Sequence, residues 1–132
     1  MITIYTDGAC SGNPGRGGWA YKVITSEGRD YLRSGPIPYT TNNAAETMAV
    51  IKALQDTAIA FNEIIHIYTD SQYVICCVDR LKAGKPIKTN TGLWDTVRSL
   101  TQGRTIRWHK TKAHDIDIHN NDCDKAARKH TK

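Results

Sequence analysis

Apolar and polar residues alternate along several short segments of the chain, and this period of two predicts β-strands. Residues 2–7, 19–24 and 30–34 carry β-branched or aromatic side chains and are separated by glycine-containing turns, so we expect an antiparallel meander. Residues 64–70 are apolar almost throughout, which is typical of a buried strand with parallel neighbours. Residues 105–110 predict a fifth strand.

Other segments repeat their apolar residues at the spacing of a helix. We expect four helices, over residues 43–60, 72–81, 93–100 and 121–129. Ser71 is a suitable cap for the second helix, and Pro36 and Pro38 predict a loop before the first. Three strands followed by alternating helices and strands indicate an α/β fold, a mixed five-stranded sheet flanked by helices, in a single domain over residues 1–132.

Composition and charge exclude some classes of protein. A chain of 132 residues suits one compact domain, and no apolar run approaches the roughly 20 residues that cross a bilayer. The N-terminus lacks the pattern of a signal peptide, so we expect a cytoplasmic protein without a membrane partner. The net charge of +5 favours anionic partners, nucleic acid first among them. The four cysteines have no zinc-site spacing, and adjacent Cys76 and Cys77 are expected to be small core residues.

The tetrapeptide Ile-Tyr-Thr-Asp occurs twice, and each copy closes a predicted strand, the first with Asp7 and the second with Asp70. Ligand sites of α/β sheets form at the carboxyl ends of strands. If the two strands are neighbours, the two aspartates lie roughly 5 Å apart. Carboxylates that close repel each other unless they are protonated or bridged by a cation. One aspartate could simply begin a turn, but the repetition favours a cation site.

Glu46 has two interpretations. Its spacing from Asn43 matches a capping box, in which Asn43 caps the helix and Glu46 is the third helical residue. Glu46 also shares a helical face with Val50, so its carboxylate points toward the sheet, where it needs a cation or hydrogen-bond donors. The pattern favours the second interpretation. Whether Asp122 or Asp124 belongs to the cation site stays undecided, because acidic residues in the first turn also interact favourably with the helix dipole.

Four blocks of residues, in order along nearly the whole chain, resemble type 1 ribonuclease H, and the bacterial branch most. The blocks are residues 5–19, 40–46 and 68–74, and residues 112–114 followed by 121–124. The resemblance implies the ribonuclease H-like fold and an enzyme that hydrolyses the RNA strand of RNA–DNA hybrids, leaving 5′-phosphate and 3′-hydroxyl ends. It also implies two divalent ions, normally Mg²⁺ with Mn²⁺ as an alternative, which agrees with the preference of these ions for oxygen ligands.

Carried over motif by motif, the resemblance assigns roles to particular residues. The metal ligands and catalytic carboxylates are Asp7, Glu46, Asp70 and Asp124, and His114 is a further catalytic residue. The hybrid-binding residues are Cys10, Asn13, Thr41, Asn42, Asn43 and Gln72. We expect a monomer.

The chain also departs from the family pattern. Residues 80–88 are short for the basic region of many bacterial relatives; they keep four basic residues but contain no tryptophan. This predicts weaker hybrid binding with a shallow salt dependence, because fewer phosphates are neutralised. Ala113 stands where a glycine is common, and Asp115 and Asp117 are acidic, which leaves the role of His114 open.

Other functions remain open from the sequence alone. A non-catalytic hybrid-binding module would have no reason to keep an anionic cluster facing phosphates. An integrase-like or resolvase-like nuclease would act on duplex DNA, whereas the asparagine-rich second block and Gln72 favour hybrid recognition. A structural ion site is the third alternative.

Overall fold

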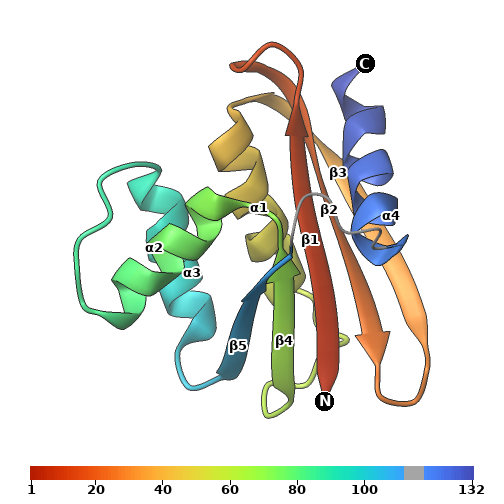
Figure 1. The fold of residues 1–132 in the computed structure, drawn as a ribbon, viewed down its shortest axis with the longest axis vertical. Helices are drawn as coiled ribbons and strands as arrows, with labels where there is room; N and C mark the ends of the chain where they lie inside the picture. Colours follow the sequence, from red (N-terminus) through yellow and green to blue (C-terminus); the bar gives the residue numbers. More distant parts are fainter. Residues whose placement is uncertain (112–117) are drawn as a thin grey trace.

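The computed structural model describes residues 1–111 and 118–132 (Figure 1). The elements in these ranges are β1 (Ile2–Cys10), β2 (Gly15–Thr25), β3 (Asp30–Thr40), α1 (Asn42–Leu54), β4 (Ile64–Thr69), α2 (Gln72–Lys82), α3 (Thr91–Thr101), β5 (Thr105–Lys110), α4 (Ile118–Arg128) and a 3₁₀ turn (Lys129–Thr131). Within the same ranges, five strands form one sheet in the order β3-β2-β1-β4-β5. Strands β1, β2 and β3 pair antiparallel, whereas β4 pairs parallel to both β1 and β5. The predicted α/β fold with a mixed sheet is therefore confirmed.

The sheet separates two apolar clusters. Side chains alternate between the faces of a strand, and in β1 Ile4 joins the main core with α1, α2 and α3, whereas Tyr5 packs beside the cluster formed with α4. Ile65 and Ile67 of β4 are fully buried in the main core, as expected for a central strand. Figure 1 shows α1 behind the sheet and α4 in front of it. Among the described residues, no helix is long and apolar enough to cross a membrane.

The prediction of a loop at Pro36 and Pro38 is wrong, because β3 continues through both prolines to Thr40. A proline cannot donate a ladder hydrogen bond and is tolerated in an edge strand. β3 is such a strand, since it lies at the end of the sheet beside β2. β2 is also longer than predicted and begins at Gly15. A Cβ atom at Gly18 would overlap the backbone carbonyl of Ala127, so this glycine lets α4 approach the sheet.

The first helix is shorter than predicted and ends at Leu54 instead of Ala60. Two tyrosine hydroxyls, of Tyr21 and Tyr31, each donate a 2.8 Å hydrogen bond to the Asp56 carboxylate. These contacts with the sheet hold Asp56 in a turn, in which its other oxygen accepts from the backbone N–H of Ala58. The helical period of the sequence continues past Leu54, but the sheet contacts decide where the helix ends.

The second helix begins as predicted, because the Ser71 hydroxyl accepts a 3.1 Å hydrogen bond from the backbone N–H of Val74. The expectation for its two cysteines is half wrong. Cys77 is buried in the core, but Cys76 is exposed. Adjacent helical residues point about 100° apart, so both cannot face the sheet.

Candidate active site

Three carboxylates meet where β1 and β4 diverge. The oxygens of Asp7 in β1, Glu46 in α1 and Asp70 after β4 lie within 4.8 Å of one another, and they are the only such group of three metal-ligating side chains among the described residues. We call these residues the carboxylate cluster. The expected adjacency of the two Ile-Tyr-Thr-Asp segments is confirmed, since Tyr5 pairs with Tyr68 in the parallel ladder between β1 and β4.

The expectation that both aspartates end a strand holds for Asp70 but is wrong for Asp7. β4 ends at Thr69, whereas β1 continues beyond Asp7 to Cys10 and remains paired with β2. The ladder between β1 and β4 extends only to the Tyr5–Tyr68 pair. The edge of β1 that faces β4 is therefore unpaired at Asp7, and the carboxylate cluster forms where the two strands stop pairing.

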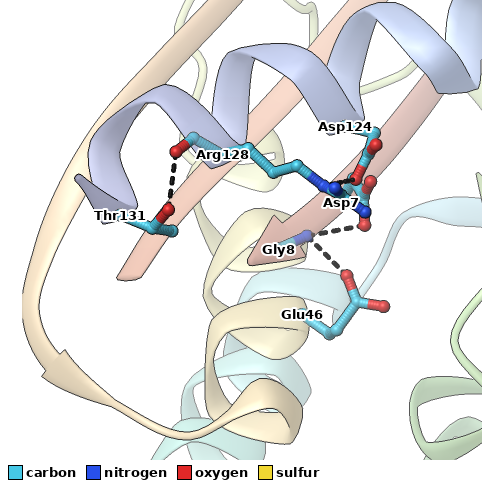
Figure 2. Close-up of polar contacts among 6 residues, drawn as sticks. All are labelled: Asp7, Gly8, Glu46, Asp124, Arg128 and Thr131. Atoms are coloured by element: carbon cyan, nitrogen blue, oxygen red, sulfur yellow. Dashed lines mark hydrogen bonds and ion pairs between the residues drawn. The ribbon is translucent and has the colours of Figure 1, made fainter. Parts of the chain in front are cut away.

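The capping-box interpretation of Glu46 is wrong. Thr41 is the N-cap of α1, and its side chain accepts from the backbone N–H of Ala44, so Glu46 lies deeper in the helix than a capping position. The Glu46 carboxylate instead accepts a 2.5 Å hydrogen bond from the backbone N–H of Gly8, which also donates to Asp7 at 2.9 Å (Figure 2). One N–H of β1 thus holds two of the three carboxylates.

Glycine is required at position 8 for this approach. A Cβ atom there would overlap the backbone of Ala45 and Glu46, which cannot move like the end of a flexible side chain. Gly8 therefore lets β1 lie directly against α1, and it sets the distance between Asp7 and Glu46. The residue pattern contains no signal for this contact, because Gly8 and Glu46 are 38 positions apart in the chain.

The cluster strongly favours neutralisation of its negative charge. Burial raises the pKa of Asp7 from 3.8 to about 7; the hydrogen bond with Glu46 opposes this, and the charges of Asp70 and Asp124 add to it. Burial and the charge of Asp7 raise the pKa of Glu46 well above its usual value. Bound divalent cations would offset both the lost hydration and the repulsion. The donor set consists of carboxylate oxygens, which fits hard cations such as Mg²⁺ or Mn²⁺.

The structure distinguishes the two aspartates, between which the residue pattern alone left the choice open and the family resemblance favoured Asp124. Asp122 accepts a 2.8 Å hydrogen bond from the Lys22 ammonium group and so ties α4 to β2. Asp124 lies close enough to Asp7 for its charge to raise the pKa of that carboxyl group. Its carboxylate pairs with Arg128 at 3.0 Å, one turn further along α4. Figure 2 shows the Arg128 side chain extending along the helix toward Asp124.

A hollow of about 330 Å³ adjoins the carboxylate cluster, and we call it the Asp124 hollow. Its lining residues come from β1, the following turn, α1 and the end of the chain, and are Gly8, Ala9, Cys10, Ser11, Asn42, Asp124, Arg128 and Thr131. The Cys10 thiol lies 3.3 Å from the carbonyl oxygen of Thr40. The sequence prediction missed Arg128, although its spacing from Asp124 is that of a helical ion pair and could have indicated it.

A second hollow, of about 530 Å³, lies at the start of α1, and we call it the Asn13 hollow. It is lined by Asn13, Thr41, Asn42, Asn43, Thr89 and Asn90. The Asn13 side chain accepts a 2.9 Å hydrogen bond from the backbone N–H of Asn42, which fixes the glycine-rich turn against the helix. Thr89 and Asn90 come from the loop before α3 and were not predicted, since nothing in that segment matches a recognised motif.

The predicted hybrid-binding residues therefore fall into two groups. Cys10, Asn13, Thr41, Asn42 and Asn43 line the two hollows, and Asn42 at the start of α1 belongs to both. Gln72 lines neither of them; it is exposed at the start of α2, where its amide lies 3.2 Å from the Cys76 sulfur. The predicted catalytic residue His114 lies outside the described residues.

Comparison with known proteins gives consistent matches over the whole chain. A family model described as RNase H matches residues 1–132. A "Ribonuclease H" of Chlorobaculum parvum is 40% identical over 139 residues, covering 96% of this chain and 92% of the relative. A "Ribonuclease H" of Chlorobium luteolum is 41% identical over 138 residues, with the same two coverages.

Solved structures agree with the fold. The structure of RNase H1 from Halobacterium salinarum has a TM-score of 0.73 and 26% identity, covering 98% of this chain and 96% of that one. LC11-RNase H1, solved in complex with an RNA/DNA hybrid, has a TM-score of 0.80 at 23% identity and covers 98% of this chain and 95% of that one. At this lower identity the similarity is one of fold.

Proposed function

Since the chain belongs to the type 1 ribonuclease H family, we propose that it is an endonuclease that cleaves the RNA strand of RNA–DNA hybrids with divalent metal ions. The observation that carries the proposal is the convergence of three carboxylates from β1, α1 and the end of β4. A pure hybrid-binding surface would gain nothing from buried anions near the phosphates, and such an arrangement is stable only with cations or protons.

We assign the metal ions to Asp7, Glu46, Asp70 and Asp124, and we propose two ions, normally Mg²⁺. When bound, two such ions supply a water of lowered pKa as the nucleophile and neutralise the charge on the leaving 3′ oxygen. The products of that reaction carry a 5′-phosphate and a 3′-hydroxyl. The Gly8 N–H orients two of the ligands, and Arg128 holds the carboxylate of Asp124.

Before they can bind cations, the ligands must lose their protons. Because the pKa of Asp7 is raised to about 7, binding of the metal at neutral pH releases protons from the cluster. The metal affinity should therefore increase with pH between about 6 and 8. This coupling arises from burial, which disfavours the ionised carboxylates as long as no cation is present.

We propose that the hybrid lies across the two hollows at the start of α1. Their lining offers amides, hydroxyls and backbone groups, which suit hydrogen bonds to phosphates and to the 2′-hydroxyls that mark an RNA strand. Cys10, Asn13, Thr41, Asn42 and Asn43 are the residues we assign to these contacts. Gln72, at the start of α2, would reach the hybrid separately, and His114 would assist proton transfer or product release. The single domain, the monomeric state and the cytoplasmic location expected from the sequence remain predictions.

One experiment tests this function against its alternatives. The protein is incubated with a labelled RNA–DNA hybrid, duplex DNA and duplex RNA, in Mg²⁺, Mn²⁺ or EDTA. We expect cleavage of the hybrid alone, lost in EDTA and in Asp70→Asn. A matched control is Asp95→Asn, which changes an exposed carboxylate on α3 that pairs with Arg98 and should leave cleavage unchanged.

The other outcomes contradict the proposal in different ways. Binding of the hybrid without cleavage would indicate a binding module. Equal cleavage of duplex DNA would indicate a nuclease of the integrase or resolvase kind. Cleavage that persists in EDTA, or in Asp70→Asn, would remove the carboxylate cluster from the reaction. End-labelling of the products distinguishes a 5′-phosphate from a 5′-hydroxyl.

A further inference from the structure

One tyrosine hydroxyl joins helix α2 to the loop before α3. The hydroxyl of Tyr73, in the first turn of α2, accepts a 3.0 Å hydrogen bond from the side-chain amide of Asn90 and a 3.2 Å hydrogen bond from the indole Nε1 of Trp94. The hydroxyl oxygen of Thr89 lies 2.9 Å from the same atom, and the carbonyl oxygen of Thr89 lies 3.3 Å from it. We call these four residues the Tyr73 network.

The backbone of Asn90 has an unusual conformation. Its φ of +48° and ψ of +42° lie in the left-handed region, and no other residue except glycine has a positive φ in the described part of the chain. Asn90 is the N-cap of α3, but its side chain does not cap the helix, as an asparagine at this position ordinarily does. The side chain bonds to Tyr73 instead. A contact with α2 therefore fixes this loop, since a strained backbone persists only where its surroundings impose it.

The Tyr73 network is attached to rigid parts of the molecule. Trp94 is 1% exposed and belongs to the main core, and its ring meets the ring of Tyr73 edge to face with centroids 6.3 Å apart. Tyr73 follows the carboxylate ligand Asp70 by three positions, and Ser71 between them caps α2. Figure 1 shows α2 and α3 beside each other, joined by this loop. The loop is thus held relative to both the core and the carboxylate cluster.

The network supports one wall of the Asn13 hollow from behind. Thr89 and Asn90 line this hollow, whereas Tyr73 and Trp94 do not. The bond to Tyr73 uses one N–H of the Asn90 amide. Within residues 1–111 and 118–132, the second N–H and the oxygen of that amide have no hydrogen-bond partner. They are therefore available to a ligand that enters the hollow.

We propose that Tyr73 is a positioning residue for hybrid binding, whose hydroxyl holds Thr89 and Asn90 in place as a wall of the Asn13 hollow. Tyr73 itself does not touch the hybrid. The inference rests on the proposed function, in which the hybrid occupies this hollow. Without the hydroxyl, the Asn90 amide loses its partner and α2 no longer imposes the left-handed backbone. The loop must then be ordered when the hybrid binds, and this entropic cost lowers the affinity.

The chemical step should not depend on Tyr73. Asp7 and Glu46 are both held by the backbone N–H of Gly8, which lies outside the Tyr73 network. Loss of the hydroxyl should therefore weaken binding of the hybrid while the metal ligands keep their positions. A raised KM with an unchanged kcat is the kinetic result of losing an interaction that contributes equally to the ground state and the transition state.

Tyr73→Phe tests the inference, because it removes the hydroxyl and keeps the ring against Trp94. We expect the KM and the Kd for the hybrid to rise about three- to tenfold, as for one lost hydrogen bond, with kcat and the calorimetric affinity for Mg²⁺ unchanged. Kd is measured in EDTA, so that no cleavage occurs. The matched control is Tyr31→Phe, since Tyr31 is also half-buried and its hydroxyl donates to Asp56, outside the hollow. That control should lose stability in urea unfolding but keep the wild-type KM and Kd.

Two further measurements separate positioning from a general loss of stability. In Tyr73→Phe, the NMR signals of the Asn90 side-chain amide and the Trp94 indole N–H should shift and exchange faster with solvent. Tyr73→Phe should also raise the Kd less in an Asn90→Ala background than in the wild type, because the hydroxyl acts through that residue.

Several results would overturn the inference. These are an unchanged Kd in folded Tyr73→Phe, a loss of kcat with an unchanged KM, or additive effects of Tyr73→Phe and Asn90→Ala on the Kd. Failure of the proposed function is distinguishable, because a wild type that binds the hybrid in EDTA but does not cleave it in Mg²⁺ refutes the nuclease and leaves the Kd comparison valid. If Tyr73→Phe does not fold, the wild type is titrated with hybrid in EDTA. Shifted Asn90 amide and Trp94 indole signals then support the inference, and unchanged signals refute it.

Discussion

Replacing Asp7 with asparagine should stabilise the protein when no metal is bound. Asp7 is 5% exposed, and its carboxylate faces those of Glu46 and Asp70. Burial, together with the charges of Asp70 and Asp124, raises its pKa from 3.8 to about 7, which corresponds to about 4 kcal/mol of differential stabilisation of the protonated form. Asparagine has nearly the same shape and carries no charge, so the substitution removes this penalty and leaves little empty space.

The direction of this effect on the free energy of unfolding follows from proton binding. Between pH 4 and 7 the folded protein retains a proton on Asp7 that the unfolded chain has already lost. The free energy of unfolding of the wild type therefore falls as the pH rises through this window, and it stays low above pH 7. In Asp7→Asn this contribution is absent. We expect the variant to be more stable by about 2–4 kcal/mol at pH 8, and by much less at pH 4.

The assay is urea unfolding followed by circular dichroism, in EDTA, at pH 4, 6 and 8. The stability gained by Asp7→Asn should be smaller in Mg²⁺, because bound ions stabilise the wild type. That stabilisation is about 2.7 kcal/mol when the Mg²⁺ concentration is a hundred times its Kd. Asp122→Asn is a control of opposite sign. The hydrogen bond from Lys22 lowers the pKa of Asp122, so its ionised form stabilises the folded protein above pH 4, and that variant should lose stability at pH 8.

A gain of Asp7→Asn that is equal at pH 4 and pH 8 would refute the electrostatic reasoning, because the penalty exists only where the carboxylate is ionised. A loss of stability at pH 8 in EDTA would show that Asp7 contributes more through its hydrogen bonds with Gly8 and Glu46 than it costs through burial.

Three further predictions concern the backbone, the helix cap and the basic loop. Gly8→Ala should cost about 1–3 kcal/mol in urea unfolding and abolish cleavage, because its Cβ overlaps the backbone of Glu46, whereas Gly92→Ala has open space and should change neither. Thr41→Ala should cost about 1 kcal/mol by removing the cap of α1 and should raise KM for the hybrid, whereas Thr41→Ser should restore both. Lys85→Ala should reduce the slope of log K against log salt by about 0.9 if the lysine contacts a phosphate; an unchanged slope would exclude that contact.

Local pattern was enough to predict much of the site. The two copies of Ile-Tyr-Thr-Asp gave two strands and two carboxylates, and the apolar run of residues 64–69 placed one strand in the centre of the sheet. Ser71 was recognisable as a cap from its own position. These features depend on residues that are close together in the chain, so composition and period suffice to predict them.

Other predictions failed where distant segments decide the outcome. The two prolines of β3 are tolerated because that strand lies at the edge of the sheet, and α1 ends early because Asp56 is bound by two tyrosines of β2 and β3. The sequence around these residues is compatible with either outcome. Only the position of each segment in the sheet selects one of them.

The sequence by itself determined the α/β fold, the family and the pair Asp7 and Asp70, because repeated motifs and alternating apolar and polar residues involve positions that are close together in the chain. The tertiary structure alone decided that Glu46 shares a backbone N–H with Asp7. The resemblance favoured Asp124 over Asp122, and the structure has the charge of Asp124 near Asp7 and binds Asp122 to Lys22. The physical reason is that charge, burial and hydrogen bonding act across space. Which carboxylates meet therefore depends on how closely β1, α1 and α4 pack, and Gly8 and Gly18 permit that packing.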